Sequence, residues 1–179
     1  MNAGAVVDPP APVGAEVLDQ LLRDHAVPVY RLALSVLGDP VLAEDVVQET
    51  MLKAWQGLAG FRGESSLRTW VLRIAHNVAV TYGRKRRDHP SDPTVMVDIV
   101  DHRASSDVER EVTGRLGVDA LWSALNSLDE LSRTVLVLRE VEHLSYEEIA
   151  EMLSLPLPTV KTRLFRARRQ LGTQLGGAS

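Results

Sequence analysis

The segment from residue 144 to residue 171 constrains the fold most strongly, because it joins two helix patterns through a short turn. It reads LSYEEIAEMLSLPLPTVKTRLFRARRQL. Ser145 and Glu148 have the spacing of a capping box, and Leu144 and Ile149 lie where a hydrophobic staple would form. Proline is tolerated only in the first turn of a helix, so the two prolines place a turn between the helices. The segment therefore predicts a helix-turn-helix.

The second helix of this motif has two different faces. At about 100° per residue, one stripe is apolar and the opposite stripe is basic, with a threonine and an aromatic side chain. The apolar stripe comprises Val160, Leu164, Ala167 and Leu171, and the opposite stripe comprises Thr162, Phe165, Arg166 and Arg169. With Lys161 at its start, such a face suits the major groove of DNA. The alternative, a solvated amphipathic helix, leaves Phe165 among arginines unexplained.

The distribution of charge also favours a nucleic-acid partner, although the net charge is −4. Nine of the 20 Lys and Arg residues lie in two clusters, at positions 84–87 and 161–169, and local basic patches are the footprint of a nucleic-acid binder. The chain has no cysteine, which excludes disulfides and thiolate metal sites. Neither a secretory signal nor an apolar run of membrane-spanning length is present. We expect a soluble, cytoplasmic protein with no membrane insertion.

The pattern along the chain predicts an all-α protein made of two small helical bundles joined by a flexible linker. Strand alternation is weak throughout, and residues 88–107 lack helical periodicity. The expected helices are 15–37, 41–55 and 66–87 in the first bundle, and 108–127, 129–141, 145–153 and 158–175 in the second. The expected domains are a disordered tail (1–14), a first bundle (15–88), a linker (89–114) and a second bundle (115–175).

The helix expected at 41–55 has an exposed face that suits a protein partner. It gathers two acids, an amide and a leucine: Asp45, Gln48, Glu49 and Leu52. Such a face could dock a basic, partly apolar surface. An ordinary acidic, solvated helix face explains the same residues equally well.

The loop at 57–65 and the helix after it hold a second candidate surface. Trp70 lies on the apolar stripe of this helix and is predicted to be part of the core. Phe61 in the glycine-rich loop, Asn77, and the basic run Arg84, Lys85, Arg86 and Arg87 are harder to explain by packing. An aromatic ring, an amide and cations are what single-stranded nucleic acid requires. For Asn77 alone, a helix-surface amide is an equally good explanation.

The sequence offers no catalytic arrangement. Its five histidines are scattered without metal-ligand spacing, and it has no glycine-rich phosphate-binding loop. We therefore expect no enzyme activity, no catalytic residues, no bound metal and no cofactor.

Three segments in order, AEDVVQETMLKAW, FRGESSLRTWVLRIAHNVA and SYEEIAEML with TVKTRLFRARRQL, resemble the extracytoplasmic-function group of the sigma-70 family. The resemblance spans roughly residues 18–88 and 115–173. It implies two domains, region 2 and region 4, that bind core RNA polymerase and promoter DNA in transcription initiation. It also implies an anti-sigma factor as a partner.

The resemblance implies specific roles for the residues above. The face formed by Asp45, Gln48, Glu49 and Leu52 would dock on the polymerase clamp. Phe61 and Asn77 would line a pocket for a base flipped from the −10 element, with residues 84–87 on the DNA backbone. The −35 element would be read by Lys161, Thr162, Phe165 and Arg166. From its position on the same helix face, we expect Arg169 to join this set, and we expect Arg168, nearer the packed flank, to contact phosphate.

Pro156 and Pro158 depart from the family pattern, which has a polar cap and a glycine before the Thr-Val pair. With these prolines present, the sequence does not determine the residue at which the recognition helix begins. Two other functions are compatible with a helix-turn-helix: a stand-alone regulator that binds duplex DNA alone, and a non-enzymatic adaptor that inhibits a partner protein. The basic recognition helix argues against the adaptor.

Overall fold

The computed structural model describes residues 14–88 and 123–176, here called the first and second halves of the molecule. Every regular element in these two ranges is helical, which confirms the all-α prediction. The expected linker at 89–114 lies outside the described residues, as do the N-terminal tail to residue 13 and most of the helix expected at 108–127. Only its end, at residues 123–126, is seen, and it is helical.

The first half is a bundle of three helices, α1 (Ala15–Leu37), α2 (Pro40–Gly57) and α3 (Leu67–Asp88). Pro28 does not split α1, which runs continuously past it. The predicted break after residue 37 has a clear local cause. Gly38 adopts the left-handed conformation that ends a helix (φ 63°), and the Asp39 side chain then accepts hydrogen bonds from the backbone N–H groups of Val41 and Leu42.

The interior of the first half is built from one apolar stripe of each helix. Val29, Leu32, Val46, Val71 and Leu72 are among its fully buried side chains. A single 3₁₀ turn, Leu58–Gly60, connects α2 to the loop that precedes α3. Because α2 and α3 pack together as rigid helices, their outward faces keep a fixed position relative to each other.

The second half contains α5 (Glu130–Leu136), a π-helical turn η2 (Val137–Val141), α6 (Tyr146–Leu153) and α7 (Leu157–Gly176). The predicted capping box is present: Ser145 Oγ accepts from the Glu148 N–H at 3.1 Å, and Glu148 Oε2 accepts from the Ser145 N–H at 2.8 Å. Leu144 and Ile149, the predicted staple residues, are both buried. Helices α6 and α7 thus form the expected helix-turn-helix.

The turn between α6 and α7 resolves the question raised by the two prolines. Ser154 takes the left-handed conformation (φ 54°) and ends α6, where a glycine would be more usual. Helix α7 begins at Leu157, so Pro158 falls in its first turn, where the missing N–H breaks no helical hydrogen bond. The Pro156 carbonyl accepts the backbone N–H groups of Thr159 and Val160. The recognition helix therefore has a regular start.

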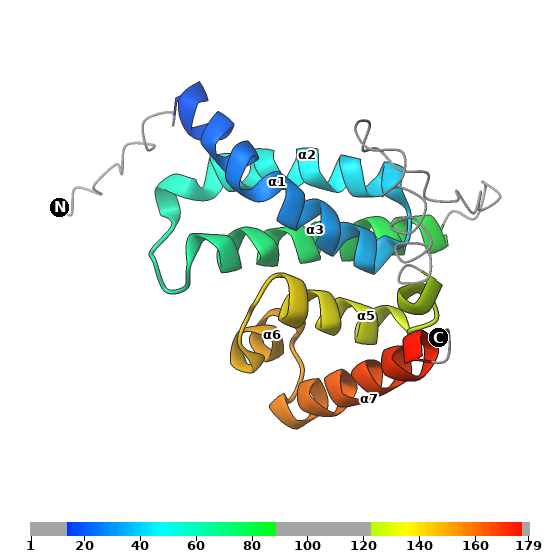
Figure 1. The fold of residues 1–179 in the computed structure, drawn as a ribbon. Coiled ribbons are helices and arrows are strands. Elements are labelled where there is room, and N and C mark those ends of the chain that lie inside the picture. The colour runs from blue at the N-terminus through cyan, green and yellow to red at the C-terminus, as the bar shows by residue number, and fades with distance from the viewer. Residues whose placement is uncertain (1–13, 89–122, 177–179) are drawn as a thin grey trace, which may run out of the picture.

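The two halves pack against each other. In Figure 1, α5 and α6 lie beneath the first bundle, with α5 against α1 and α6 near α3, and α7 lies on the side away from that bundle. Buried apolar residues of both halves form one continuous cluster. The faces in contact are therefore part of the interior of this arrangement.

Candidate DNA- and polymerase-binding surfaces

Helix α7 buries one face and exposes the other, as the periodicity predicted. Val160, Leu164 and Ala167 are buried. On the opposite side Phe165 is 65% exposed, and the four polar residues of the predicted DNA-reading set are also exposed: Lys161, Thr162, Arg166 and Arg169. A large aromatic side chain left mostly in water at the centre of a basic face indicates a binding surface, because most of its apolar area is not buried within the chain.

Side chains on this face differ in the number of polar contacts that they make within the chain. Among the described residues, neither Arg166 nor Arg169 forms an ion pair. The Thr162 hydroxyl donates to the Pro158 carbonyl at 2.8 Å, which leaves its methyl group and oxygen lone pairs for other contacts. Lys161 Nζ lies 5.8 Å from the centre of the Tyr146 ring, a cation–π contact that links α7 to α6.

The two arginines on the flanks of α7 are bound within the second half. Arg163 Nη1 lies 3.1 Å from Asp129 Oδ1, and Arg168 donates to Glu140 Oε1 from Nε at 3.0 Å and from Nη2 at 2.5 Å. The sequence predicted that Arg168 contacts phosphate, but in the structure its guanidinium faces a carboxylate. The reason is that the adjacent element places Glu140 opposite it, which helix periodicity alone cannot show.

In the first half, Phe61 packs on Trp70. Their ring centres are 5.1 Å apart with the planes tilted by 45°, a usual geometry for an aromatic pair. Trp70 is half-buried against the core, so it is both a packing residue and part of the surface around Phe61. A Cβ on Gly57 would lie 3.2 Å from the Trp70 indole, so the end of α2 leaves room for this ring.

Asn77 is exposed on the same stripe of α3 as Trp70. Seven residues separate them, which is nearly two turns and about 10 Å along the helix. The structure therefore brings Phe61, Trp70 and Asn77 to one side of the first half. Sequence reasoning favoured the core over a ligand-binding role for Trp70. The signal that could have indicated its place beside this surface is its spacing of two turns from Asn77.

The four basic residues at 84–87 form the exposed C-terminal end of α3. Lys85 Nζ lies 5.9 Å from the Tyr82 ring centre, and Arg86 Nη1 lies 3.5 Å from Asp39 Oδ2. Cations are stabilised at a helix C-terminus by the helix dipole. The run is therefore partly accounted for by the fold, while its exposure leaves it accessible to phosphate.

The outer face of α2 presents Asp45, Gln48 and Leu52 to solvent, and Leu52 is 50% exposed. Glu49 differs from the rest because Lys53 Nζ lies 2.8 Å from its Oε1. That contact lowers the pKa of Glu49, with a smaller contribution from a hydrogen bond to Tyr82. The free acid of the predicted docking face is thus Asp45, beside an exposed leucine.

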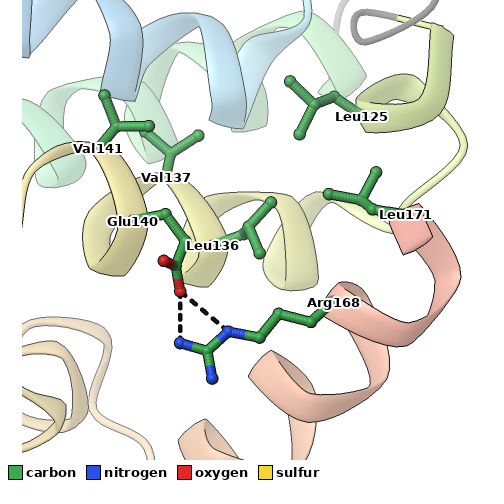
Figure 2. Close-up of a pocket in the computed structure, with 7 residues that line it drawn as sticks. All are labelled: Leu125, Leu136, Val137, Glu140, Val141, Arg168 and Leu171. Atoms are coloured by element: carbon green, nitrogen blue, oxygen red, sulfur yellow. Dashed lines mark hydrogen bonds and ion pairs between the residues drawn. The ribbon is translucent and has the colours of Figure 1, made fainter. Parts of the chain in front are cut away.

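An apolar depression of about 380 Å³ lies in the second half between α5, η2 and α7. Figure 2 shows Leu125, Leu136 and Leu171 around it, with the Glu140–Arg168 ion pair along one side. Apart from that pair, the lining residues that the structure describes are apolar.

Two further observations concern the described residues only. No group of three or more His, Asp or Glu side chains is placed to hold a metal ion there. None of the helices in these ranges has the length and apolar character needed to cross a membrane.

Comparisons with known proteins identify the family of the chain. Residues 21–89 match Sigma-70 region 2, and residues 119–171 match Sigma-70, region 4. The chain is 35% identical over 138 residues to an ECF RNA polymerase sigma-E factor of Haemophilus influenzae, covering 73% of each chain. It is 34% identical over 165 residues to the RNA polymerase sigma-H factor of Pseudomonas aeruginosa, covering 88% of this chain and 85% of that one.

Solved structures show the same relationship. The sigma factor RpoE of Bartonella quintana, in complex with the anti-sigma factor NepR, superposes with a TM-score of 0.68 at 28% identity, covering 90% of this chain and 97% of that one. CnrH, in complex with the cytosolic domain of CnrY, gives 0.63 at 28% identity, covering 93% and 92%. The chain therefore belongs to the extracytoplasmic-function group of the sigma-70 family, the sigma factors that direct RNA polymerase to promoters.

Proposed function

We propose that this sigma factor uses three separate surfaces to start transcription: one for core RNA polymerase and two for promoter DNA. The observation that carries the proposal is the outward face of α7. There, Phe165 is 65% exposed between arginines that have no ion-pair partner among the described residues. Because neither the ring nor these arginines are satisfied by such contacts, an external, negatively charged and partly apolar ligand such as the major groove explains the composition of this face.

The second half would read the −35 element through α7. Arg166 lies near the middle of the helix and is the best candidate to bond a base edge, since Arg commonly binds guanine O6 and N7. Phe165 and the Thr162 methyl group suit contact with thymine methyl groups. Lys161 and Arg169, toward the two ends of this face, suit phosphate contacts that fix the register.

The first half would hold the −10 element. Phe61 and Trp70 offer aromatic surface for an unstacked base, and the exposed Asn77 amide can hydrogen-bond a base edge. The basic run Arg84, Lys85, Arg86 and Arg87 would hold the promoter backbone.

The outer face of α2 would dock on core polymerase through Asp45, Gln48, Glu49 and Leu52. Support comes from the exposed leucine beside a free carboxylate, since an interface combines an apolar centre with charges that select the partner. Glu49 would contribute less than Asp45, because Lys53 already neutralises it.

Two further assignments complete the proposal. An anti-sigma factor would hold this protein inactive, as the relatives RpoE and CnrH were solved with NepR and with the cytosolic domain of CnrY. The protein would act in the cytoplasm, as a DNA-recognition subunit and not as an enzyme. Support comes from the sigma-factor relatives, which are DNA-recognition subunits of RNA polymerase.

A charge reversal on α2 tests the docking surface. Asp45→Arg should weaken binding to core polymerase at least about tenfold, because like charges across an interface cost several kcal/mol. Glu44→Arg is the matched control, since Glu44 is also an exposed acid of α2 but lies about 100° away around the helix. Equal affinities of the two variants, with circular dichroism like that of the wild type, would exclude this face as the docking site.

A further inference from the structure

Tyr82 lies between the proposed docking face of α2 and the basic end of α3, and it contacts both. Its hydroxyl group donates a hydrogen bond to the Glu49 carboxylate on α2. On α3 itself, Lys85 Nζ lies 5.9 Å from the centre of the Tyr82 ring. Burial raises the pKa of the Tyr82 hydroxyl, and the hydrogen bond to Glu49 raises it further. The hydroxyl therefore stays protonated at neutral pH and acts as the donor.

Glu49 can anchor Tyr82 because another cation already balances its charge. Lys53 Nζ lies 2.8 Å from Glu49 Oε1, one turn further along α2. The contact with Lys53 is the main reason that the pKa of Glu49 is lowered, and the more distant charge of Lys85 adds a smaller contribution. Within residues 14–88, no ion pair joins Glu49 to Lys85. The carboxylate thus holds the tyrosine hydroxyl and leaves the Lys85 ammonium available.

The cations at 84–87 are held in different ways. Arg86 Nη1 lies 3.5 Å from Asp39 Oδ2, whereas Arg84 forms no ion pair with a residue that the structure describes. A carboxylate partner competes with a DNA phosphate for its cation. An aromatic ring instead restrains an ammonium group without neutralising it, because the attraction comes from the quadrupole of the ring. Lys85 is therefore held in place and still carries its full charge.

Restraining a lysine before it binds has a physical benefit. A free lysine side chain has many rotamers, and most of this freedom is lost when the ammonium group is fixed on a phosphate. A side chain that is already restrained loses less, so the same contact contributes more to affinity. Tyr82 and Lys85 are three residues apart and therefore neighbours on one face of α3. The ring thus sets where the Lys85 charge is presented.

We propose that Tyr82 is a positioning residue for promoter binding: its hydroxyl is anchored on Glu49, and its ring orients the Lys85 ammonium for contact with the DNA backbone. The inference rests on the proposed function, because it requires Lys85 to bind promoter phosphate. Tyr82 needs no contact of its own with DNA or polymerase. Because Glu49 belongs to the proposed docking face, this chain of contacts also connects the polymerase-binding surface to a DNA-binding cation.

Three variants of the full chain separate the contacts of Tyr82. Tyr82→Phe keeps the ring and removes the hydroxyl group, whereas Tyr82→Leu removes the ring. Lys85→Ala removes the charge that the ring positions. Tyr30→Leu is the matched control, because Tyr30 is also a half-buried tyrosine of the first half, and no cation of the described residues lies over its ring. Circular dichroism and thermal unfolding establish that each variant folds.

The first readout is the NMR spectrum of the Lys85 side chain in the free protein. In the wild type and in Tyr30→Leu, its methylene signals should show a ring-current shift and restricted motion. Tyr82→Phe should keep the shift but gain motion, because the ring has lost its anchor. Tyr82→Leu should give the signals of an unrestrained lysine. Identical Lys85 signals in the wild type and in Tyr82→Leu would overturn the positioning role.

The second readout is binding of the holoenzyme, at saturating core polymerase, to a promoter duplex identified by run-off transcription. Lys85→Ala should weaken binding several-fold and lower the salt slope by about 0.9, the value for one phosphate contact. Tyr82→Leu should weaken binding in the same direction, and Tyr82→Phe should do so less. Adding Tyr82→Leu to Lys85→Ala should change the affinity by less than about twofold, because the ring acts through Lys85.

The possible failures are distinguishable. Further weakening by Tyr82→Leu in the Lys85→Ala background would show a general structural effect and overturn the inference. A lowered salt slope for Lys85→Ala with wild-type binding by Tyr82→Leu would overturn the positioning role alone. A wild-type slope for Lys85→Ala would overturn it together with the assignment of Lys85 to the DNA backbone. If no fragment gave a transcript, the proposed function would fail, while the Lys85 signals would still test the positioning.

Discussion

At the scale of single residues, Arg166 and Arg168 are close neighbours on α7 with different surroundings. Arg168 binds Glu140 through two nitrogens, whereas Arg166 has no ion-pair partner among the described residues. Residue type and helix angle make both of them plausible DNA contacts. Only the placement of Glu140 on the neighbouring element distinguishes them. The two residues therefore allow an arginine with an ion-pair partner to be compared with one that has none, on the same helix.

Arg166→Ala should weaken binding to a matched −35 duplex by about 1–3 kcal/mol and relax the preference at one or two base pairs. Arg168→Ala should change affinity for the same DNA by less than about 0.5 kcal/mol, because an exposed ion pair contributes little and the guanidinium is already engaged. Binding titrations on matched and scrambled duplexes measure both effects. Equal loss on the two duplexes for Arg166→Ala would show a backbone contact and contradict base reading.

Phe61→Ala and Asn77→Ala should impair promoter opening more than initial duplex binding. A flipped base requires stacking and hydrogen bonds, and each contact is worth roughly 1–3 kcal/mol. Permanganate reactivity of unpaired thymines in the holoenzyme complex reports opening, and Gln56→Ala, an exposed change on α2, is the control. Wild-type opening by both variants would exclude the pocket.

At the scale of elements, the helix-turn-helix depends on the capping box at the start of α6. The Ser145 N–H donates to the Glu148 carboxylate, and this hydrogen bond is the main reason that the pKa of Glu148 lies below its ordinary value. A group whose pKa is lower in the folded state stabilises the protein above its unfolded pKa. That contribution is lost as the pH falls through the folded pKa.

Glu148→Gln should therefore lower the free energy of unfolding by about 1 kcal/mol at neutral pH, the usual size of a capping interaction. The difference from the wild type should shrink as the pH falls below the ordinary pKa of a glutamate and through the lowered folded-state pKa, because the carboxylate then becomes protonated. Chemical denaturation at several pH values measures this, with Glu147→Gln as the control for loss of an exposed acid. A difference that stayed constant over the whole range would argue against the carboxylate cap.

Most elements could be predicted from the sequence because their signals are local. The break at Gly38 and Asp39, the capping box at Ser145 and the apolar stripe of α7 each follow from residues within one or two turns. The π-helical turn η2 could not be foreseen, since the sequence pattern of 129–141 fits a single α-helix. For the candidate surfaces, helix periodicity predicted which side chains of each helix are exposed. Contacts between elements, such as Phe61 with Trp70 or Glu49 with Tyr82, required the packed structure.

At the scale of the whole molecule, the main unexpected feature is the docking of the two halves. The sequence predicted two bundles on a flexible linker, with nothing to fix their relation. The structure instead joins them through Glu142, which pairs with Arg31 and Arg68 of the first half, and through a shared apolar cluster. Residues 31, 68 and 142 are far apart in the chain, so no local pattern could have indicated that they meet.

The central claim, that this chain directs RNA polymerase to promoters, is tested most directly by run-off transcription. Purified protein and core polymerase would be incubated with genomic fragments, and transcript lengths would be measured with and without the chain. The account predicts discrete transcripts that require the chain and that disappear with Asp45→Arg but persist with Glu44→Arg. Failure to produce any discrete transcript, with core that is active with another sigma factor, would contradict it.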